Sequence, residues 1–250
     1  KVWFHVIQQT NGTGSISDSR INAQMTALNE DFLALSGTQG QNGFGTKIRF
    51  ELEGITRTTN NAWYSDSFND ETAYKTALRR DTSAFLNVYS NDAQGFLGYA
   101  YLPPGNAGTF YDGVVILDGS VGGRNNGFSV YDQGRTLTHE VGHYLGLLHT
   151  FQGGCSNSFT SGDLVTDTNA EQEPYLNVSA SCPSRSTCGN PDPVSNYMDY
   201  NRDSCMDRFT SQQSNRMVCS LLNYRPGVVN VVTQQGQVVP LSAIMLLLDS

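Results

Sequence analysis

The segment from Thr136 to Thr150, TLTHEVGHYLGLLHT, constrains the fold of this chain more than any other. His139 and His143 are four residues apart, so on a helix their imidazoles lie one turn apart on the same face. Gly146 follows and predicts the end of that helix, because glycine adopts a left-handed backbone at little cost. The chain can then turn back and bring His149 beside the first two histidines.

Three imidazoles gathered in this way predict a zinc site, at about 2.0–2.1 Å per nitrogen. Three protein ligands leave one position open for water, which is typical of catalytic rather than structural zinc. Glu140 follows the first ligand and is placed to reach that water as a general base. A bare H-E-x-x-H is often ordinary helix surface, but the added glycine and third histidine favour the metal site. His5, the one histidine outside the motif, alternates with core residues and predicts a buried strand position without a role.

The charge balance excludes several classes of partner. The net charge of −8 disfavours binding to the phosphate backbone of nucleic acid. The sequence also has no run of basic residues that could bind an anionic membrane. No stretch reaches the roughly 20 apolar residues of a membrane span, and the apolar tail at 238–248 is short and interrupted by a proline. We therefore expect a monomer whose partners are protein or peptide substrates, not nucleic acid or membranes.

Cysteine usage favours an oxidising compartment. None of the five cysteines forms a C-x-x-C pair, and they lie in loops rich in Ser, Asn, Gly and Pro, as cross-links of an irregular region do. Four can pair and one is left over. Sequons at Asn11 and Asn177 fit a secretory route. The chain opens at Lys1 without an initiator Met, as after removal of a leader and propeptide or trimming to a mature form. We expect a secreted, extracellular protein.

The first half of the chain predicts an α/β fold. Alternating or continuous apolar residues predict strands at 2–7, 48–52, 85–89 and 114–117, with an extended stretch at 95–104. Helical spacing predicts helices at 21–35, stopped by Gly37, and at 71–80. Regularity is lost for about sixty residues after Thr150, which is expected only where function or cross-links hold the chain. Order returns at Thr210, where T-S-Q-Q resembles a capping box that opens a helix.

The motif HEVGHYLGLLHTFQGGC, followed by the distant NYMDY, resembles the pappalysin family of metzincin metalloproteases, which includes ulilysin-like enzymes. Metzincins place a methionine in a tight turn beneath the zinc, and Met198 matches that position. Tyr200 matches a tyrosine that in several metzincins coordinates zinc or stabilises the transition state. A methionine between two tyrosines is by itself more often core packing, and its coupling to the zinc motif favours the turn. GRTLTHEVGH, GD-x-V-x-DT and CMDRFTSQQSNRM are also similar to the family.

The resemblance implies the architecture and the activity. It covers residues 1 to about 226 and implies a metzincin-type fold: a twisted, mostly parallel sheet with backing helices above the cleft, and a smaller irregular, disulfide-stapled lobe below it. We expect one catalytic domain over 1–226, with an upper lobe over about 1–148, a lower lobe over about 149–226, and a tail at 227–250 without an assigned role. The implied activity is zinc-dependent endopeptidase chemistry, in which a zinc-activated water attacks the peptide bond.

The same resemblance implies a calcium site and two disulfides. Pappalysin-like enzymes bind calcium close to the acidic loop 162–171, where carboxylates and turn residues concentrate; a solvated acidic loop is the alternative. The candidate calcium ligands are Asp163, Asp167, Thr168 and Glu171. The interleaved pairing of the family implies the disulfides Cys155–Cys188 and Cys182–Cys205, which leaves Cys219 unpaired or matched to a cysteine of a removed prosegment.

Asp203 is the candidate for substrate preference. It lies five positions after Met198, on a segment that in metzincins walls the S1′ pocket for the side chain just after the scissile bond. A carboxylate there would favour Arg or Lys, because an Arg fork forms a charge-assisted bidentate pair, and ulilysin-like members favour a basic residue. The alternative is that Asp203 caps a turn or pairs with Arg202 or Arg208.

Two rival interpretations belong to different classes. A thermolysin-like gluzincin would take a glutamate from a downstream helix as third ligand, but Glu171 and Glu173 lie in a loop and His149 makes them unnecessary. The non-enzyme alternative is an inactive metal-binding adhesin or inhibitor on the same scaffold. The intact Glu140 argues against it, since such a scaffold needs no general base.

Overall fold

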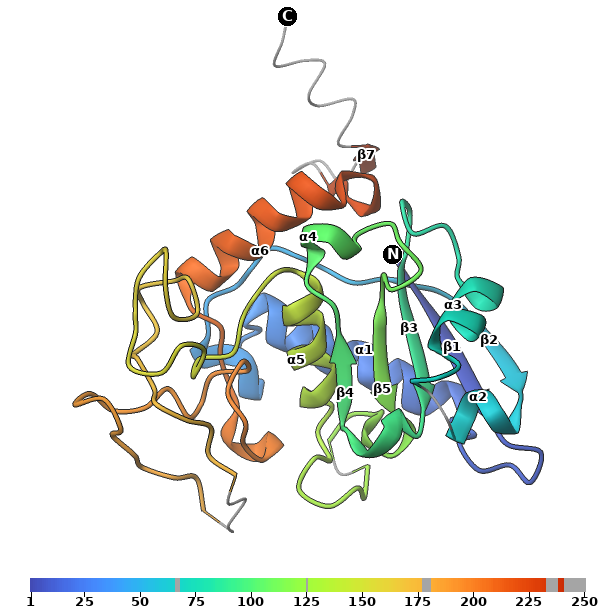
Figure 1. Cartoon of the computed structure of the whole chain (residues 1–250), viewed down its shortest axis with the longest axis horizontal. Coiled ribbons are helices and arrows are strands. Elements are labelled where there is room, and N and C mark those ends of the chain that lie inside the picture. Colours follow the sequence, from blue (N-terminus) through green and yellow to red (C-terminus); the bar gives the residue numbers. More distant parts are fainter. Residues whose placement is uncertain (66–67, 125, 177–180, 233–237, 241–250) are drawn as a thin grey trace, which may run out of the picture.

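The computed structural model describes the chain except for residues 66–67, 125, 177–180, 233–237 and 241–250, so Asn177 and most of the apolar tail lie outside the described residues. A five-stranded sheet of order β2-β1-β3-β5-β4 lies in the centre and right of the view in Figure 1. Its strands are β1 Val2–Gln8, β2 Leu52–Thr59, β3 Leu86–Asn91, β4 Gly98–Ala100 and β5 Val114–Leu117. All neighbouring pairs are parallel except β4 with β5, which confirms the mostly parallel sheet.

Six helices and several short turns accompany the sheet in the described residues. The helices are α1 Asp18–Leu33, α2 Asn61–Ser65, α3 Glu71–Leu78, α4 Pro103–Asn106, α5 Arg135–Tyr144 and α6 Ser211–Tyr224. The 3-10 turns are η1 Gln39–Asn42, η2 Ala93–Gly95, η3 Asp118–Ser120, η4 Asp203–Cys205 and η5 Pro226–Val228. The capping box of Thr210 and Gln213 opens α6 as predicted. A separate hairpin pairs β6 Asn230–Val232 with β7 Val238–Pro240.

The predicted strand at 48–52 is wrong in position, because β2 begins only at Leu52. Phe50 is buried, yet its main chain bonds to the side-chain amide of Asn29 on α1 rather than to a neighbouring strand. The alternation of apolar residues at 48–52 therefore reflects packing against helix α1 rather than pairing with a neighbouring strand. The first helix also ends earlier than predicted, at Leu33, because Ala34 already takes the left-handed conformation (φ 49°) before the chain reaches Gly37.

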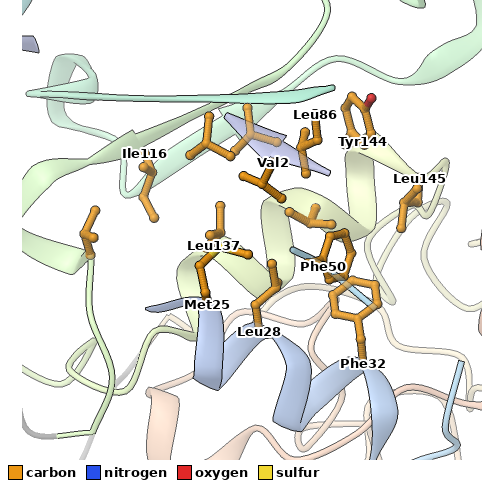
Figure 2. Close-up of a cluster of buried hydrophobic side chains, with 14 of the residues drawn as sticks. Val2, Met25, Leu28, Phe32, Phe50, Leu86, Ile116, Leu137, Tyr144 and Leu145 are labelled. Carbon is orange, nitrogen blue, oxygen red and sulfur yellow. The ribbon is translucent and has the colours of Figure 1, made fainter. Parts of the chain in front are cut away.

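The main core fills the space between the sheet and the helices α1 and α5 (Figure 2). Val2 and Ile116 come from the sheet, Leu28 and Phe32 from α1, and Leu137 from α5. Burial of this apolar area provides the main stabilisation, at about 25 cal/mol per Å². Because α5 lies in this core, the helix that carries the first two motif histidines is held rigidly against the sheet.

The described residues of 149–210 are irregular apart from η4, are cross-linked, and lie to the left of α5 in Figure 1. Cys155 is bonded to Cys188 and Cys182 to Cys205, the pairing that the resemblance implied. Cys219 is a free, exposed thiol on α6. The disulfides restrict the loops of this lobe, which has little regular hydrogen bonding of its own. Among the described residues, no helix is long and apolar enough to cross a membrane.

Candidate active site

The end of α5 and the turn after it bring the three motif histidines together. The helix ends at Tyr144, and Gly146 follows with φ of 93°, in the left-handed region that favours glycine. A side chain at Gly146 would also collide with Ser220 of α6, since a Cβ there would lie 2.7 Å from Oγ. Arg216, also on α6, donates from Nε to the Gly146 carbonyl at 2.8 Å. The turn that returns His149 to the helix is therefore held from two sides.

The three Nε2 atoms of His139, His143 and His149 lie 3.0–3.1 Å from one another. Nδ1 of His139 donates to the Tyr197 carbonyl at 2.6 Å, and Nδ1 of His143 donates to the Leu147 carbonyl at 2.8 Å. A carbonyl only accepts, so both Nδ1 atoms carry the proton and both Nε2 atoms present lone pairs.

Converging lone pairs repel unless a cation lies between them. Burial, reinforced by the neighbouring imidazoles, lowers the pKa of His139 well below its usual value, and burial lowers the pKa of His149 to about 3. Neutral imidazoles are the protonation state that a metal requires. Among the described residues, these histidines form the one group of three or more His, Cys, Asp or Glu with ligand atoms within 4.8 Å of one another. An all-nitrogen donor set of this size fits zinc.

Glu140 lies on α5 between the first two histidines and faces a cavity of about 330 Å³. Burial raises the pKa of its carboxyl to about 8. Gly98 of β4 lies directly above it, and a Cβ at Gly98 would come within 2.8 Å of the Glu140 Cγ. The absence of a side chain at Gly98 therefore lets the edge strand approach the carboxylate.

The segment around Met198 lies beneath the histidines. Met198 is fully buried with its sulfur against Gly142 of α5, where a Cβ would collide with it. Its carbonyl accepts a hydrogen bond from the Thr150 amide at 3.2 Å. Tyr200, two residues on, is 41% exposed, and its ring centroid lies 4.8 Å from that of His149. The structure thus brings Met198 and Tyr200 to the predicted histidine cluster.

Asp31 of α1 also supports the site, and sequence analysis missed it. Its buried carboxylate accepts hydrogen bonds from Thr138 at 2.6 Å and Tyr197 at 2.8 Å, and pairs with Arg135 at 3.1 Å. Burial raises the pKa of Asp31 to about 6. The one signal in the sequence is an acidic residue three positions after Leu28, on the apolar face of a helix.

Asp203 lies in the wall of the same cavity, together with Tyr131 and Thr136. Its Oδ2 accepts from the amides of Gln133 and Arg135 at 2.8 and 3.2 Å, so one oxygen caps the start of α5. Its Oδ1 is buried and has no hydrogen-bond partner among the described residues. Burial raises the pKa of the carboxyl to about 6. The carboxylate thus has one oxygen engaged in the fold and one buried oxygen without a hydrogen-bond partner among the described residues.

The four candidate calcium ligands are not brought to one point. Asp163 accepts from the Thr168 hydroxyl at 2.6 Å, whereas Asp167 accepts from Thr210 and from the Gln212 amide, at the start of α6. Glu171 is fully buried elsewhere, where it accepts from Thr150 at 3.1 Å. Neighbours in the loop sequence are separated because the irregular chain turns between them.

Comparisons with known proteins agree with this geometry. Residues 77–222 match the sequence model of the M43 peptidase family, pregnancy-associated plasma protein-A. Extracellular metalloprotease 1 of Coccidioides posadasii is 41% identical over 237 residues, which cover 91% of this chain and 78% of that protein. An extracellular metalloprotease of Colletotrichum graminicola is 42% identical over 234 residues, covering 89% and 76%.

Comparison with solved structures also identifies similar metalloproteases. Mature mirolysin of Tannerella forsythia, in complex with a cleaved peptide, has a TM-score of 0.72 at 33% identity, covering 86% of this chain and 88% of that one. Promirolysin of the same organism has a TM-score of 0.76 at 31% identity, covering 91% and 82%. The metzincin fold and the extracellular location expected from the sequence are confirmed. The chain belongs to the pappalysin family and is a zinc-dependent metalloendopeptidase.

Proposed function

We propose that His139, His143 and His149 hold the zinc ion and that Glu140 is the general base of peptide-bond hydrolysis. The observation that carries this proposal is the convergence of three imidazole lone pairs beside a buried carboxylate that opens into a cavity. When bound, zinc lowers the pKa of water towards about 7 and polarises the scissile carbonyl. The ionised form of Glu140, which a neighbouring cation favours, takes the proton of the attacking water and passes it to the leaving amine.

Tyr200 and Met198 have supporting roles in this proposal. The Tyr200 hydroxyl donates a hydrogen bond to the oxyanion that forms from the scissile carbonyl. Its ring lies against His139 and His149, and the same cavity reaches Tyr200 and Glu140. Met198 packs under α5 and keeps the floor of the site apolar and rigid. The test is cleavage of a protein substrate with and without a chelator, followed by restoration with zinc.

We further propose that Asp203 selects Arg or Lys after the scissile bond. The cavity wall holds three carboxyl groups, those of Glu140, Asp199 and Asp203, and one guanidinium, Arg135, which is already paired with Asp31. The remaining negative charge and the unpartnered Oδ1 of Asp203 suit a cationic side chain that donates hydrogen bonds. The pKa of about 6 leaves Asp203 ionised at neutral pH. Cleavage of a peptide library read by mass spectrometry tests this preference.

Calcium binding is a separate proposal, which rests on Glu171 rather than on all four loop residues. Glu171, Asp192 and Asp199 are buried together around one guanidinium, with Arg185 at 3.8 Å from Glu171 and 3.4 Å from Asp192. Burial raises the pKa of Glu171 to about 7, and burial together with the charge of Glu171 raises that of Asp199 to about 8. A calcium ion bound at Glu171 would balance part of this negative charge and would take its remaining ligands from other oxygens, because the three carboxylates do not converge on one point.

The remaining proposals concern organisation and the alternative class. We infer one catalytic domain over 1–226, because α6 and Arg225 pack against α5, where Arg225 donates to the Tyr144 carbonyl at 2.8 Å and pairs with Asp112 at 2.6 Å. An inactive adhesin or inhibitor remains the rival to hydrolysis. Glu140, placed at an open cavity, favours the enzyme, and the chelator experiment separates the two.

A further inference from the structure

The mouth of the active-site cavity carries three exposed apolar side chains that the proposed reaction does not use. Phe96 is 55% exposed and Leu176 is 75% exposed, and both line the cavity. Phe68 is 44% exposed, and its ring centroid lies 5.6 Å from that of Phe96. We call Phe68, Phe96 and Leu176 the apolar rim. Large apolar side chains gathered at the edge of a cleft are typical of a binding surface.

The position of the apolar rim along the substrate follows from β4. Among the described residues this strand ends the sheet and pairs only with β5 (Figure 1), so its outer edge can pair with an extended peptide. Gly98 lies against Glu140, and this marks the place of the scissile bond. The cavity extends from there along 95–97, towards the start of the strand. A peptide whose side chain after the cut points at Asp203 therefore continues towards Phe96.

The spacing sets which substrate residue reaches the rim. Phe96 precedes Gly98 by two residues, which is about 6.6 Å along an extended chain. A peptide beside the free edge advances by the same amount in two residues. The second or third residue after the scissile bond thus lies over Phe96, with Phe68 beside Phe96 and Leu176 also in the cavity lining.

We propose that the apolar rim is a second specificity site, which binds a large apolar or aromatic side chain at the second or third position after the cut. Such a side chain covers Phe96 and removes apolar surface of both partners from water. Aromatic residues add favourable ring contacts with the pair Phe68 and Phe96. The inference rests on the proposed function, because Asp203 sets the direction in which the peptide runs.

The test is a peptide library with Arg fixed after the cut and the next two positions varied. We expect kcat/KM to be about tenfold higher with Phe, Tyr or Leu than with Gly or Asp at one of these positions. Phe96→Ser should reduce that ratio to near one, and Leu176→Ser should reduce it in part. Phe159→Ser is the matched control, because Phe159 is 66% exposed and does not line the cavity. It should leave the ratio unchanged.

Two results would overturn the proposal: a ratio near one in the unmodified enzyme, or an unchanged ratio in both rim variants. A second library, varied at the position just after the cut, separates this failure from failure of the Asp203 assignment. Loss of the Arg preference there with the apolar preference intact would count against Asp203 alone. Zinc content and circular dichroism of each variant identify misfolding, and the two rim variants, in separate segments of the chain, provide independent measurements.

Discussion

Nδ1 of His139 donates to the main-chain carbonyl of Tyr197 at 2.6 Å, and this bond joins the first motif histidine to the methionine turn. The hydroxyl of the same tyrosine donates to Asp31, which also accepts from Thr138 beside that histidine. Asp31 of α1 therefore positions both α5 and the methionine turn, the two elements that face the metal position. Such supporting contacts orient a ligand and fix its tautomer.

Asp31→Ala should destabilise the fold by about 3 kcal/mol, because it leaves the buried Arg135 guanidinium without its ion pair. Urea unfolding at pH 7 with zinc present measures the loss. Glu30→Ala, at the adjacent position, is the control: among the described residues the Glu30 carboxylate pairs with the exposed Arg124, at 4.0 Å, and its loss should cost less than about 0.5 kcal/mol. Equal effects of the two changes would show that Asp31 has no special part in the site.

Glu140→Gln should reduce kcat at least about 100-fold while zinc content stays near one per chain. The amide keeps the shape of the side chain but cannot take a proton from water. Peptide hydrolysis and metal analysis of the same preparation check both statements. Activity within a few fold of the unmodified enzyme would remove Glu140 from the role of base.

His149→Ala should lose zinc and activity together, since two imidazoles remain where three converge. His5→Asn should keep zinc, because His5 is buried in β1 and bonds to Asn87 at 2.9 Å, away from the cluster. Metal content after dialysis distinguishes them. A His149→Ala enzyme that still binds zinc tightly and cleaves peptides would contradict the ligand assignment.

The zinc motif could be predicted because its information is local. Helical spacing places His139 beside His143, and the glycine requirement at 146 follows from backbone sterics, so neither depends on distant contacts. Asp31 could not be found in this way, because its partner Thr138 is 107 positions away. The four candidate calcium ligands are close in the sequence, but an irregular loop does not keep sequence neighbours close in space. Asp167 accordingly caps α6 instead.

Calcium should raise the thermal midpoint of the unmodified protein, since an ion that binds only the folded state stabilises that state. Glu171→Gln should remove this response. Asp167→Asn is the matched control: it weakens the cap of α6 and should lower the midpoint by a few degrees while the calcium response persists. Differential scanning calorimetry with and without calcium measures both. A persistent response in Glu171→Gln would place any calcium site elsewhere.

The preference for Arg over Leu after the scissile bond should weaken as the pH falls through about 6. Burial raises the pKa of Asp203 to about 6, so the carboxylate is ionised above this pH and neutral below it. Only the ionised form attracts the guanidinium, so the ratio of kcat/KM for matched Arg and Leu peptides should fall about tenfold between pH 7 and pH 5. Ionisation of Glu140 affects both peptides alike and cancels in the ratio. Asp203→Asn should show a low ratio that does not change with pH. A flat ratio in the unmodified enzyme would mean that Asp203 serves only to cap α5 through Oδ2.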